Sequence, residues 1–473
     1  MYNSRNENLI CSHPKMIAFN SFWGAFSGLF IIWFLILNYN SHTVYLQNCL
    51  GLSVRVFCFY LFTVFIVQSS FGSFFAALKN ISTILVYGRI TLIILLATLI
   101  WLLFSYTPKT FNNMKLSEFY YGAIGFIIFS IIIVERISAL TYHNPTKNTF
   151  QEVKTISNIT SCFYLGLILA FIVASIFFHY FSFISAFIFA IIITFVNFLS
   201  SLLASGASAK DIFKSPFKVV KENSSLNETI FAQFNRLKKQ NLKPSNIILC
   251  SISYVLTLLV ALNLIFLKQS TAIYFNISFI IILFASFLFG FIFTTSFAPS
   301  LLQKIKNKHH LLDIMLGSIL GVICCLIVGL ITVNVPHQSI KIFDLKIEYS
   351  FISMTNCFFA GLFMSFIHNP LYYKFYENIK NSNLFFHAIS LYLAIRAAIS
   401  LVCIIIILPL HVYPFLSEHI IMDNILSSST FREIENFNII RVLITLSGLS
   451  SFAIYLIIKK LVKKSGNQEW KNF

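Results

Sequence analysis

The chain has 473 residues, of which 58% are hydrophobic and only 11% are charged. Soluble domains carry about twice that share of charged residues, so the composition excludes a water-soluble globular protein. The formal charge of +18 comes from Lys and Arg in short segments between apolar runs. That distribution sets orientation in a membrane and argues against nucleic acid as a partner.

In chain order, a polar start at 1–16 is followed by apolar runs, each long enough to cross a bilayer, which takes roughly 20 residues. The predicted spans are 17–38, 55–77, 88–105, 119–140, 158–180, 182–206, 246–267, 271–297, 312–333, 350–368, 386–410 and 438–458. Very short turns join 158–180 to 182–206 and 246–267 to 271–297, which predicts two helical hairpins. The fold class is therefore an all-α integral membrane protein with about twelve transmembrane helices.

The distribution of Lys and Arg predicts the orientation. With the N-terminus inside, 25 of these residues fall on the inner side, 8 fall on the outer side, and Arg396 lies within a span. Short cytoplasmic loops are enriched in Lys and Arg, so both termini are expected in the cytoplasm. A multi-pass protein of a bacterial inner membrane is the expected location.

The segment 207–245 separates the spans into two groups of six and carries 8 of the Lys and Arg residues. We expect a basic cytoplasmic linker that lies along the anionic inner leaflet. The predicted domains are a cytoplasmic N-terminus at 1–16, a six-helix half at 17–206, the linker at 207–245, a second six-helix half at 246–458 and a basic cytoplasmic tail at 459–473. Two outer loops, 334–349 and 411–437, are long enough to carry polar groups.

Short motifs accompany this architecture. The stretch 72–79 has a Gly and a Lys after the second span but no acidic residue, and Gly88-Arg89 follows later. The stretch 298–306 has the same basic character after the eighth span. The fourth span contains Gly122 and Gly125, and the fifth has Gly166 but no Gly-Pro pair.

Six spans, a basic inner linker and six further spans resemble the major facilitator superfamily of secondary transporters. The resemblance covers the whole chain and is mainly architectural. It implies two six-helix halves that rock about a central substrate site, giving alternating access. The missing acidic residues and the missing Gly-Pro pair indicate a divergent member or another twelve-helix transporter.

Ionisable residues inside a span mark functional sites, because burying a charge in a membrane is costly. Arg396 stands about ten residues into the predicted span 386–410, roughly 15 Å deep. Because Arg stays charged, it needs an anion, polar groups or water. Two interpretations remain open: Arg396 binds a carboxylate or phosphate of the substrate, or it bonds helix carbonyls and extends to the interface.

Glu135 and Arg136 end the fourth span on the inner side. Either they form a gate that exchanges partners as the halves move, or they are ordinary charges at the membrane surface. Titratable groups near the inner ends of spans are Glu135, His368 and His387, and proton coupling through Glu135 is the expectation.

Uncharged polar and aromatic residues in the spans complete the predicted substrate site. Gln68 and Asn356 are chosen by depth, and Asn20 and Tyr392 are added, with Trp23 and Tyr254 as further aromatic walls. Polar side chains in spans also serve as contacts between helices, and that alternative stays open. The nine Cys show no C-x-x-C pair, and neither a metal site nor a cofactor is expected.

The leading hypothesis is a secondary active transporter for a small anionic or zwitterionic solute, with protons as a coupling partner. Alternatives are a drug efflux antiporter, a flippase for a lipid or lipid-linked sugar, and a membrane enzyme that uses the outer loop 411–437. The chain has no nucleotide-binding loop or nucleophile elbow. This absence argues against an ATP-driven pump built from this chain alone, and under the leading hypothesis we expect no catalytic residues and no enzyme activity.

Overall fold

The computed structural model describes part of the chain, namely residues 14–41, 62, 65, 89–90, 92–94, 96–98, 149–205, 235, 244–269, 277–304, 308–332, 338–342, 345–379, 388–389, 391–403 and 456. The predicted spans 55–77, 119–140 and 438–458 lie almost wholly outside these residues. The chain divides into two compact units, which comprise Met1–Leu242 with Ile379–Ala394, and Lys243–Asn378 with Ile395–Phe473. The proposed domain boundaries stay a prediction.

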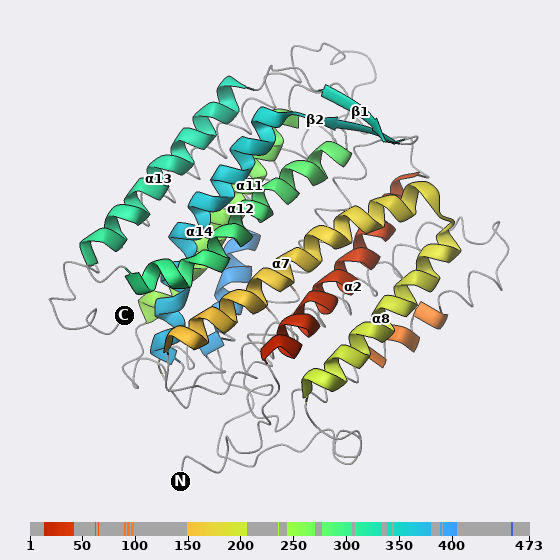
Figure 1. Ribbon diagram of the computed structural model, residues 1–473, viewed down its shortest axis with the longest axis horizontal. Helices are drawn as coiled ribbons and strands as arrows, with labels where there is room; N and C mark the ends of the chain where they lie inside the picture. Colours follow the sequence, from red (N-terminus) through yellow and green to blue (C-terminus); the bar gives the residue numbers. More distant parts are fainter. Residues whose placement is uncertain are drawn as a thin grey trace, which may run out of the picture. The chain divides into compact units, whose positions relative to one another are not determined.

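The first unit contains α2 (Pro14–Ser41), α7 (Thr149–Tyr180) and α8 (Phe183–Ser205). Helix α2 lies between α7 and α8, as Figure 1 shows. Only two residues separate α7 from α8, which confirms the first predicted helical hairpin.

Close packing in the first unit depends on a small residue and on aromatic rings. A Cβ atom at Gly166 of α7 would collide with the backbone carbonyl of Phe22 on α2, so the two helices approach at a position that only Gly permits. Phe30 of α2 packs against Phe177 of α7 and Phe189 of α8, with ring centroids 5.5 and 5.1 Å away. These contacts join all three helices.

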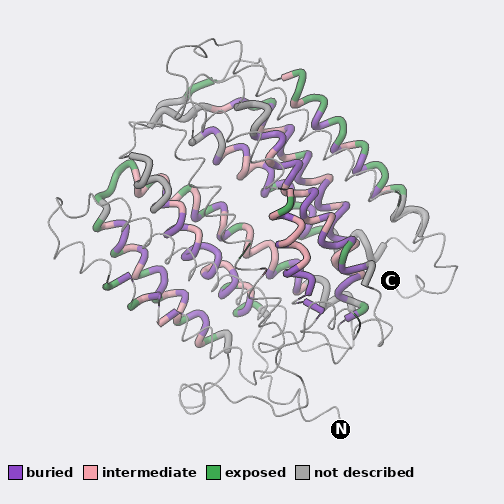
Figure 2. The backbone as a smooth tube through the Cα atoms, turned by 180° about the vertical axis from the view of Figure 1, so that it is seen from behind, coloured by how far each residue is buried: buried purple, intermediate pink, exposed green. Residues whose placement is uncertain are grey.

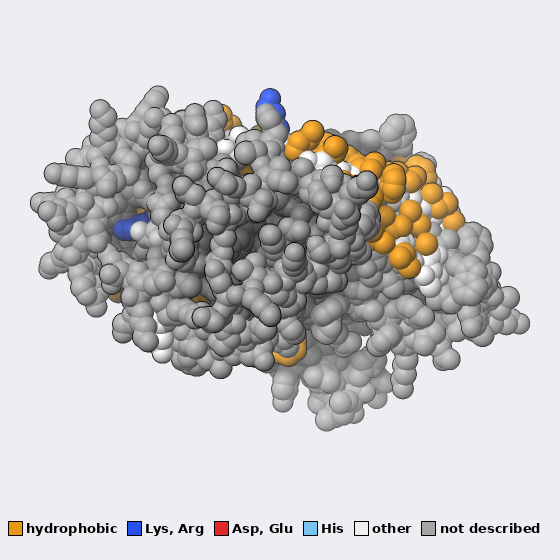
Figure 3. Space-filling model, turned by 90° about the horizontal axis from the view of Figure 1, so that it is seen from below, with side chains coloured by type: hydrophobic (Ala, Val, Ile, Leu, Met, Phe, Trp, Pro, Cys, Tyr) orange, Lys and Arg blue, Asp and Glu red, His pale blue; other side chains and the backbone are white. Residues whose placement is uncertain are grey.

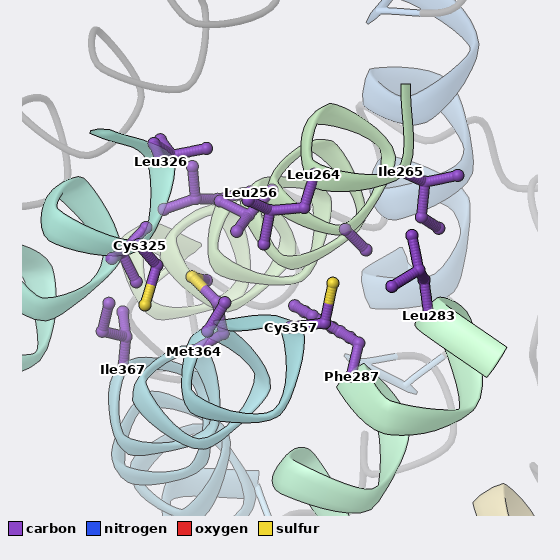
Figure 4. Close-up of a cluster of buried hydrophobic side chains, with 14 of the residues drawn as sticks. Leu256, Leu264, Ile265, Leu283, Phe287, Cys325, Leu326, Cys357, Met364 and Ile367 are labelled. Carbon is purple, nitrogen blue, oxygen red and sulfur yellow. The ribbon is translucent and has the colours of Figure 1, made fainter. Parts of the chain in front are cut away.

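The second unit contains α11 (Pro244–Gln269), α12 (Ile277–Lys304), α13 (Lys308–Ile331) and α14 (Phe351–Ile379). One apolar cluster draws side chains from all four helices, as the close-up in Figure 4 shows. Its members include Leu256 and Leu264 from α11, Leu283 and Phe287 from α12, Cys325 and Leu326 from α13, and Cys357, Met364 and Ile367 from α14.

Two glycines let α12 and α14 cross at close range. A Cβ atom at Gly290 of α12 would collide with the carbonyl of Phe358, and one at Gly361 of α14 would collide with the carbonyl of Phe287. The contact is therefore reciprocal, with each helix placing its Gly against the other's backbone. Small residues at helix crossings are typical of membrane bundles, because the backbones must approach closely to pack well.

The outward faces of several helices are apolar stripes with helical spacing. On α8 the exposed side chains are Ile184, Ile188, Ile192, Phe195, Leu199 and Leu203. On α13 they include Leu316, Leu320, Ile323, Ile327 and Ile331. Figure 2 shows buried and exposed positions alternating along the helices, and Figure 3 shows a continuous patch of hydrophobic side chains on one face. Buried positions hold many of the polar residues, which is the reverse of a soluble protein.

Six of the described helices are long and apolar enough to cross a membrane. They lie at Lys15–Phe34, Thr155–Tyr180, Ile184–Leu203, Asn246–Ile265, Asp313–Ile331 and Phe351–Tyr376, and shorter apolar helices occupy Ile281–Phe297 and Leu391–Cys403. Together with the exposed apolar stripes, these helices identify a multi-pass integral membrane protein.

The structure differs from the sequence-based expectation in several elements. Helix α7 begins at Thr149, before the predicted start at 158, and α12 begins at Ile277, after the predicted start at 271. The predicted loop 334–349 contains an antiparallel hairpin of β1 (Gln338–Ile342) and β2 (Leu345–Tyr349), with Ile340 opposite Ile347. Helix α14 continues past the predicted end at 368 and carries Pro370 in its interior. The extension is held because Tyr373, Phe375 and Tyr376 are buried.

Candidate functional site

Arg396 stands on the helix Leu391–Cys403, and its guanidinium lies over the ring of Tyr254 on α11. The distance from the guanidinium carbon to the ring centroid is 4.1 Å, well within cation–π range. The Arg396 side chain is half-buried in an apolar segment. The ring stabilises the cation through its face without neutralising it.

His368 of α14 lies against the same Tyr254 ring. The two ring centroids are 6.0 Å apart and steeply inclined, and the imidazole is buried. Its Nδ1 is 2.9 Å from the hydroxyl oxygen of Ser253, which precedes Tyr254 on α11. Adjacent residues of α11 therefore contact His368 by a hydrogen bond and Arg396 by a ring face.

Further aromatic rings enclose His368. Phe291 of α12 has its centroid 6.1 Å from the imidazole, and Tyr372, one turn further along α14, stacks on it at 5.9 Å. Tyr392, one turn before Arg396 on the same helix, is buried. We define the Arg396–His368 site as Ser253, Tyr254, His368, Tyr372 and Arg396.

A buried polar group lies on the turns of α14 beside His368. The amide nitrogen of Asn369 donates to Ser365 at 2.6 Å and to Thr295 of α12 at 3.2 Å. The hydroxyls of Thr295 and Ser365 are 3.2 Å apart. Pro370 follows directly and has no N–H to continue the helical hydrogen bonds, so these side chains hold α12 and α14 together where the ladder of α14 is interrupted.

Two of the predicted substrate ligands take part in hydrogen bonds between helices. The side-chain oxygen of Asn20 accepts hydrogen bonds from Ser200 and Ser201 of α8, both at 2.9 Å. The amide of Asn356 donates to the carbonyl of Cys325 at 2.8 Å, which links α14 to α13. Both side chains are buried. These bonds agree with the alternative that Asn20 and Asn356 serve as contacts between helices. Substrate binding by either residue stays a prediction.

Several of the predicted site residues lie in parts of the chain that the structure does not describe. Gln68, Glu135, Arg136 and the outer loop 411–437 lie outside the described residues. Among the residues that the structure describes, none is a hydrogen-bond partner of the buried indole N–H of Trp23 on α2, and a place for Trp23 in the solute site stays a prediction.

Arg89, one of the Lys and Arg residues counted on the inner side, has a completely buried side chain. The only sequence signal was its position at the start of the apolar run 88–105. Ser253 was missed altogether. It is 115 residues from its partner His368, and neither helix pattern points to the other.

No known protein-family model matches the sequence, and no curated protein is similar to it in sequence. Solved structures match it over nearly their whole length. The human organic anion transporter MFSD10 (TETRAN) superposes with a TM-score of 0.58 at 10% identity, covering 93% of this chain and 99% of its own.

A bacterial homologue of the iron transporter ferroportin, in an outward-facing state, gives a TM-score of 0.55 at 10% identity and covers 93% of this chain and 98% of its own. The E. coli fucose:proton symporter FucP gives 0.50 at 12% identity and covers 92% and 97%. At such identities the likeness defines the fold and leaves the solute open. The predicted fold class is confirmed: the chain is a multi-pass, mainly helical membrane protein with the same fold as these transporters.

Proposed function

We propose that the protein is a secondary active transporter that moves a small anionic or zwitterionic solute by alternating access. The observation that carries this proposal is Arg396, a permanent cation held 4.1 Å over the Tyr254 ring within an apolar helix. A charge at such a position is costly and is retained where it serves a function. The fold supports transport, because the similar solved structures are transporters of a sugar, organic anions and iron.

The solute class follows from the chemistry of Arg396. A guanidinium binds planar carboxylates and phosphates through paired N–H donors, and the aromatic rings beside it offer an apolar surface for the rest of the solute. A small organic carboxylate or phosphate fits this pair of features. Tyr392 and Gln68 stay predicted contributors, and Glu135 with Arg136 stays the predicted cytoplasmic gate.

The orientation and location belong to the same proposal. The excess of Lys and Arg on one side supports cytoplasmic termini and an inner-membrane location in a bacterium. The linker 207–245 would then lie against the anionic leaflet.

Transport in proteoliposomes tests the proposal. Radiolabelled benzoate, succinate and phosphate are offered to vesicles with the wild-type protein, with Arg396→Ala, or with His419→Ala from the outer loop. We expect saturable uptake of at least one anion by the wild type and by His419→Ala, and its loss in Arg396→Ala. Loss in His419→Ala with full activity in Arg396→Ala would instead favour a function based on the outer loop.

A drug efflux antiporter is the second candidate, favoured by the aromatic lining around Tyr254, Phe291 and Tyr372. Such a protein would move cationic drugs without needing Arg396. Uptake of a cationic dye such as ethidium that persists in Arg396→Ala would support it.

A further inference from the structure

The first turn of α11 presents backbone N–H groups that have no carbonyl of their own helix to bond. Pro244 opens the helix and has no N–H to donate, so the groups left at this end include those of Ser245 and Asn246. The aligned peptide dipoles give a helix N-terminus a partial positive charge, which attracts anions. The first turn of α11 contains no acidic residue that would neutralise this charge.

The side chain of Asn246 adds a further donor at the same end. It is 6% exposed, and no described residue accepts a hydrogen bond from its buried Nδ2 atom. Side chains of a helix tilt toward its N-terminus, so the amide of Asn246 extends toward the end of α11. A buried N–H group without an acceptor is costly, and an acceptor bound at this end would remove that cost.

The sequence around this end is strongly basic. The eight residues before Pro244 include four bases, namely Arg236, Lys238, Lys239 and Lys243. No Asp or Glu occurs between Glu228 and Asp313. An anion at the start of α11 therefore has cations close to it along the chain and no carboxylate from this stretch to repel it.

The end of α11 is also the start of a candidate membrane span. That span runs from Asn246 to Ile265, so its first residue carries the buried amide. The headgroups of lipids, with their phosphates, lie where a span leaves the hydrocarbon core. Helix N-termini bind phosphate groups, because their N–H donors and their dipole both favour a negatively charged acceptor.

We propose that the N-terminus of α11 is a phosphate site, at which the Asn246 amide and the backbone N–H groups of Ser245 and Asn246 donate to one phosphate group. The start of a span favours the headgroup of an anionic phospholipid as its source, and free phosphate offers the same chemistry. Asn246 stands about two helical turns before Ser253. The inference goes beyond the proposed function and does not depend on the solute.

Native mass spectrometry of the full-length protein measures how many lipids stay bound and with what affinity. The purified, delipidated protein is titrated with phosphatidylglycerol and, separately, with phosphatidylcholine, whose choline neutralises the phosphate charge. A second arm compares thermal unfolding of the same protein in sodium phosphate and in sodium chloride at equal ionic strength. The variants are Asn246→Leu, Asn246→Asp and, as the matched control further along α11, Asn263→Leu.

Asn246→Leu keeps every charge of the chain, so it separates the amide from general attraction by the basic linker. We expect it to weaken the tightest phosphatidylglycerol site on the order of tenfold, because a hydrogen bond to a charged acceptor is lost. Without lipid it should unfold at the same or a higher temperature than the wild type, because Leu leaves no donor unsatisfied. Phosphatidylcholine should bind more weakly than phosphatidylglycerol.

Asn246→Asp should bind phosphatidylglycerol at least as weakly as Asn246→Leu, because its carboxylate repels the phosphate. It should nevertheless fold well, since a negative charge is favourable in the first turn of a helix. Asn263→Leu should bind the lipid as the wild type does.

The two arms assign the source of the phosphate. Weaker lipid binding in Asn246→Leu, with no effect of sodium phosphate on unfolding, supports a lipid headgroup. Stabilisation by sodium phosphate that Asn246→Leu removes supports free phosphate. The inference is overturned if the wild type binds neither, if both Asn246 variants match the wild type in both arms, or if Asn263→Leu loses as much binding. Transport of the solute is measured separately, so each of these results leaves the proposed function standing.

Discussion

Tyr254 contacts the guanidinium of Arg396 through its ring face. The guanidinium lies over the ring face, and the hydroxyl of Tyr254 has no part in that contact. The ring of Tyr254 without its hydroxyl should therefore give the same contact with Arg396, because the attraction comes from the aromatic face.

Replacing Tyr254 separates the contribution of the ring from that of its hydroxyl. Tyr254→Leu removes a cation–π contact worth about 0.5–2 kcal/mol, so anion affinity should fall by roughly 2- to 30-fold. Tyr254→Phe keeps the ring and should stay within about twofold of the wild type. Equilibrium binding of the transported anion measures both, and an equal loss in the two variants would show that the hydroxyl contacts the solute.

Asn20 offers a second test at the scale of one residue. Its oxygen lies 2.9 Å from the hydroxyls of Ser200 and Ser201, and each hydroxyl has the backbone carbonyl of Asn197 as an alternative acceptor for its single hydrogen. Asn20→Ala should therefore lower stability only modestly, by about 0.6–1.7 kcal/mol. A small drop in the unfolding temperature with unchanged anion binding would assign Asn20 to helix packing, whereas loss of binding by a stable variant would assign it to the solute.

The crossing of α12 and α14 positions the Arg396–His368 site, because His368 and its polar neighbours stand on these helices. Gly361→Ala and Gly290→Ala each place a methyl group against a backbone carbonyl that cannot move aside without separating the helices. We expect a loss of about 1–3 kcal/mol or more in each variant. Fluorescence-detected thermal unfolding measures it.

Gly317→Ala on α13 is the matched control, since a Cβ atom there meets nothing within 4 Å. It should be neutral or slightly stabilising, because Ala favours a helix more than Gly does. Equal effects at Gly317 and Gly361 would contradict the close crossing.

Several elements could be predicted from the sequence, and others could not. The helices α7 and α8 follow from long apolar runs with a two-residue turn between them. The β1–β2 hairpin was readable in principle, because apolar and charged residues alternate from Ile340 to Ile342 and again from Phe343 to Glu348. The hairpin was not predicted, because only helices were expected in a chain of this composition. The end of α14 was placed too early, since polar residues and Pro370 suggested a stop that the buried Tyr373 and Phe375 override.

At the scale of the whole molecule, hydropathy and charge were enough to predict the fold class. A membrane admits few architectures, because the backbone N–H and C=O groups within it must all be hydrogen-bonded inside the protein. The arrangement of the candidate site could not be predicted from the sequence. Arg396 and His368 could be found as polar exceptions in apolar runs, but their shared contact with Tyr254 joins residues more than a hundred positions apart. No periodicity within one helix encodes such a contact.

The orientation of the whole molecule is open to a labelling test. Ser339 of β1 is exposed, and the predicted topology places it outside, while Ser224 belongs to the predicted cytoplasmic linker. In intact cells, a membrane-impermeant maleimide should label Ser339→Cys and leave Ser224→Cys at the background set by the natural cysteines. Permeabilised cells should label both, and the opposite pattern would invert the topology.

The central claim is that Arg396 anchors an anionic solute, and one measurement addresses it most directly. Thermal-shift binding is compared for wild type, Arg396→Lys and Arg396→Ala over organic anions, amino acids and cationic drugs. We predict that an anion stabilises the wild type, that Arg396→Ala loses the shift, and that Arg396→Lys loses most of it because Lys lacks the planar pair of donors. Stabilisation by cationic or neutral drugs alone, undiminished in Arg396→Ala, would contradict the account.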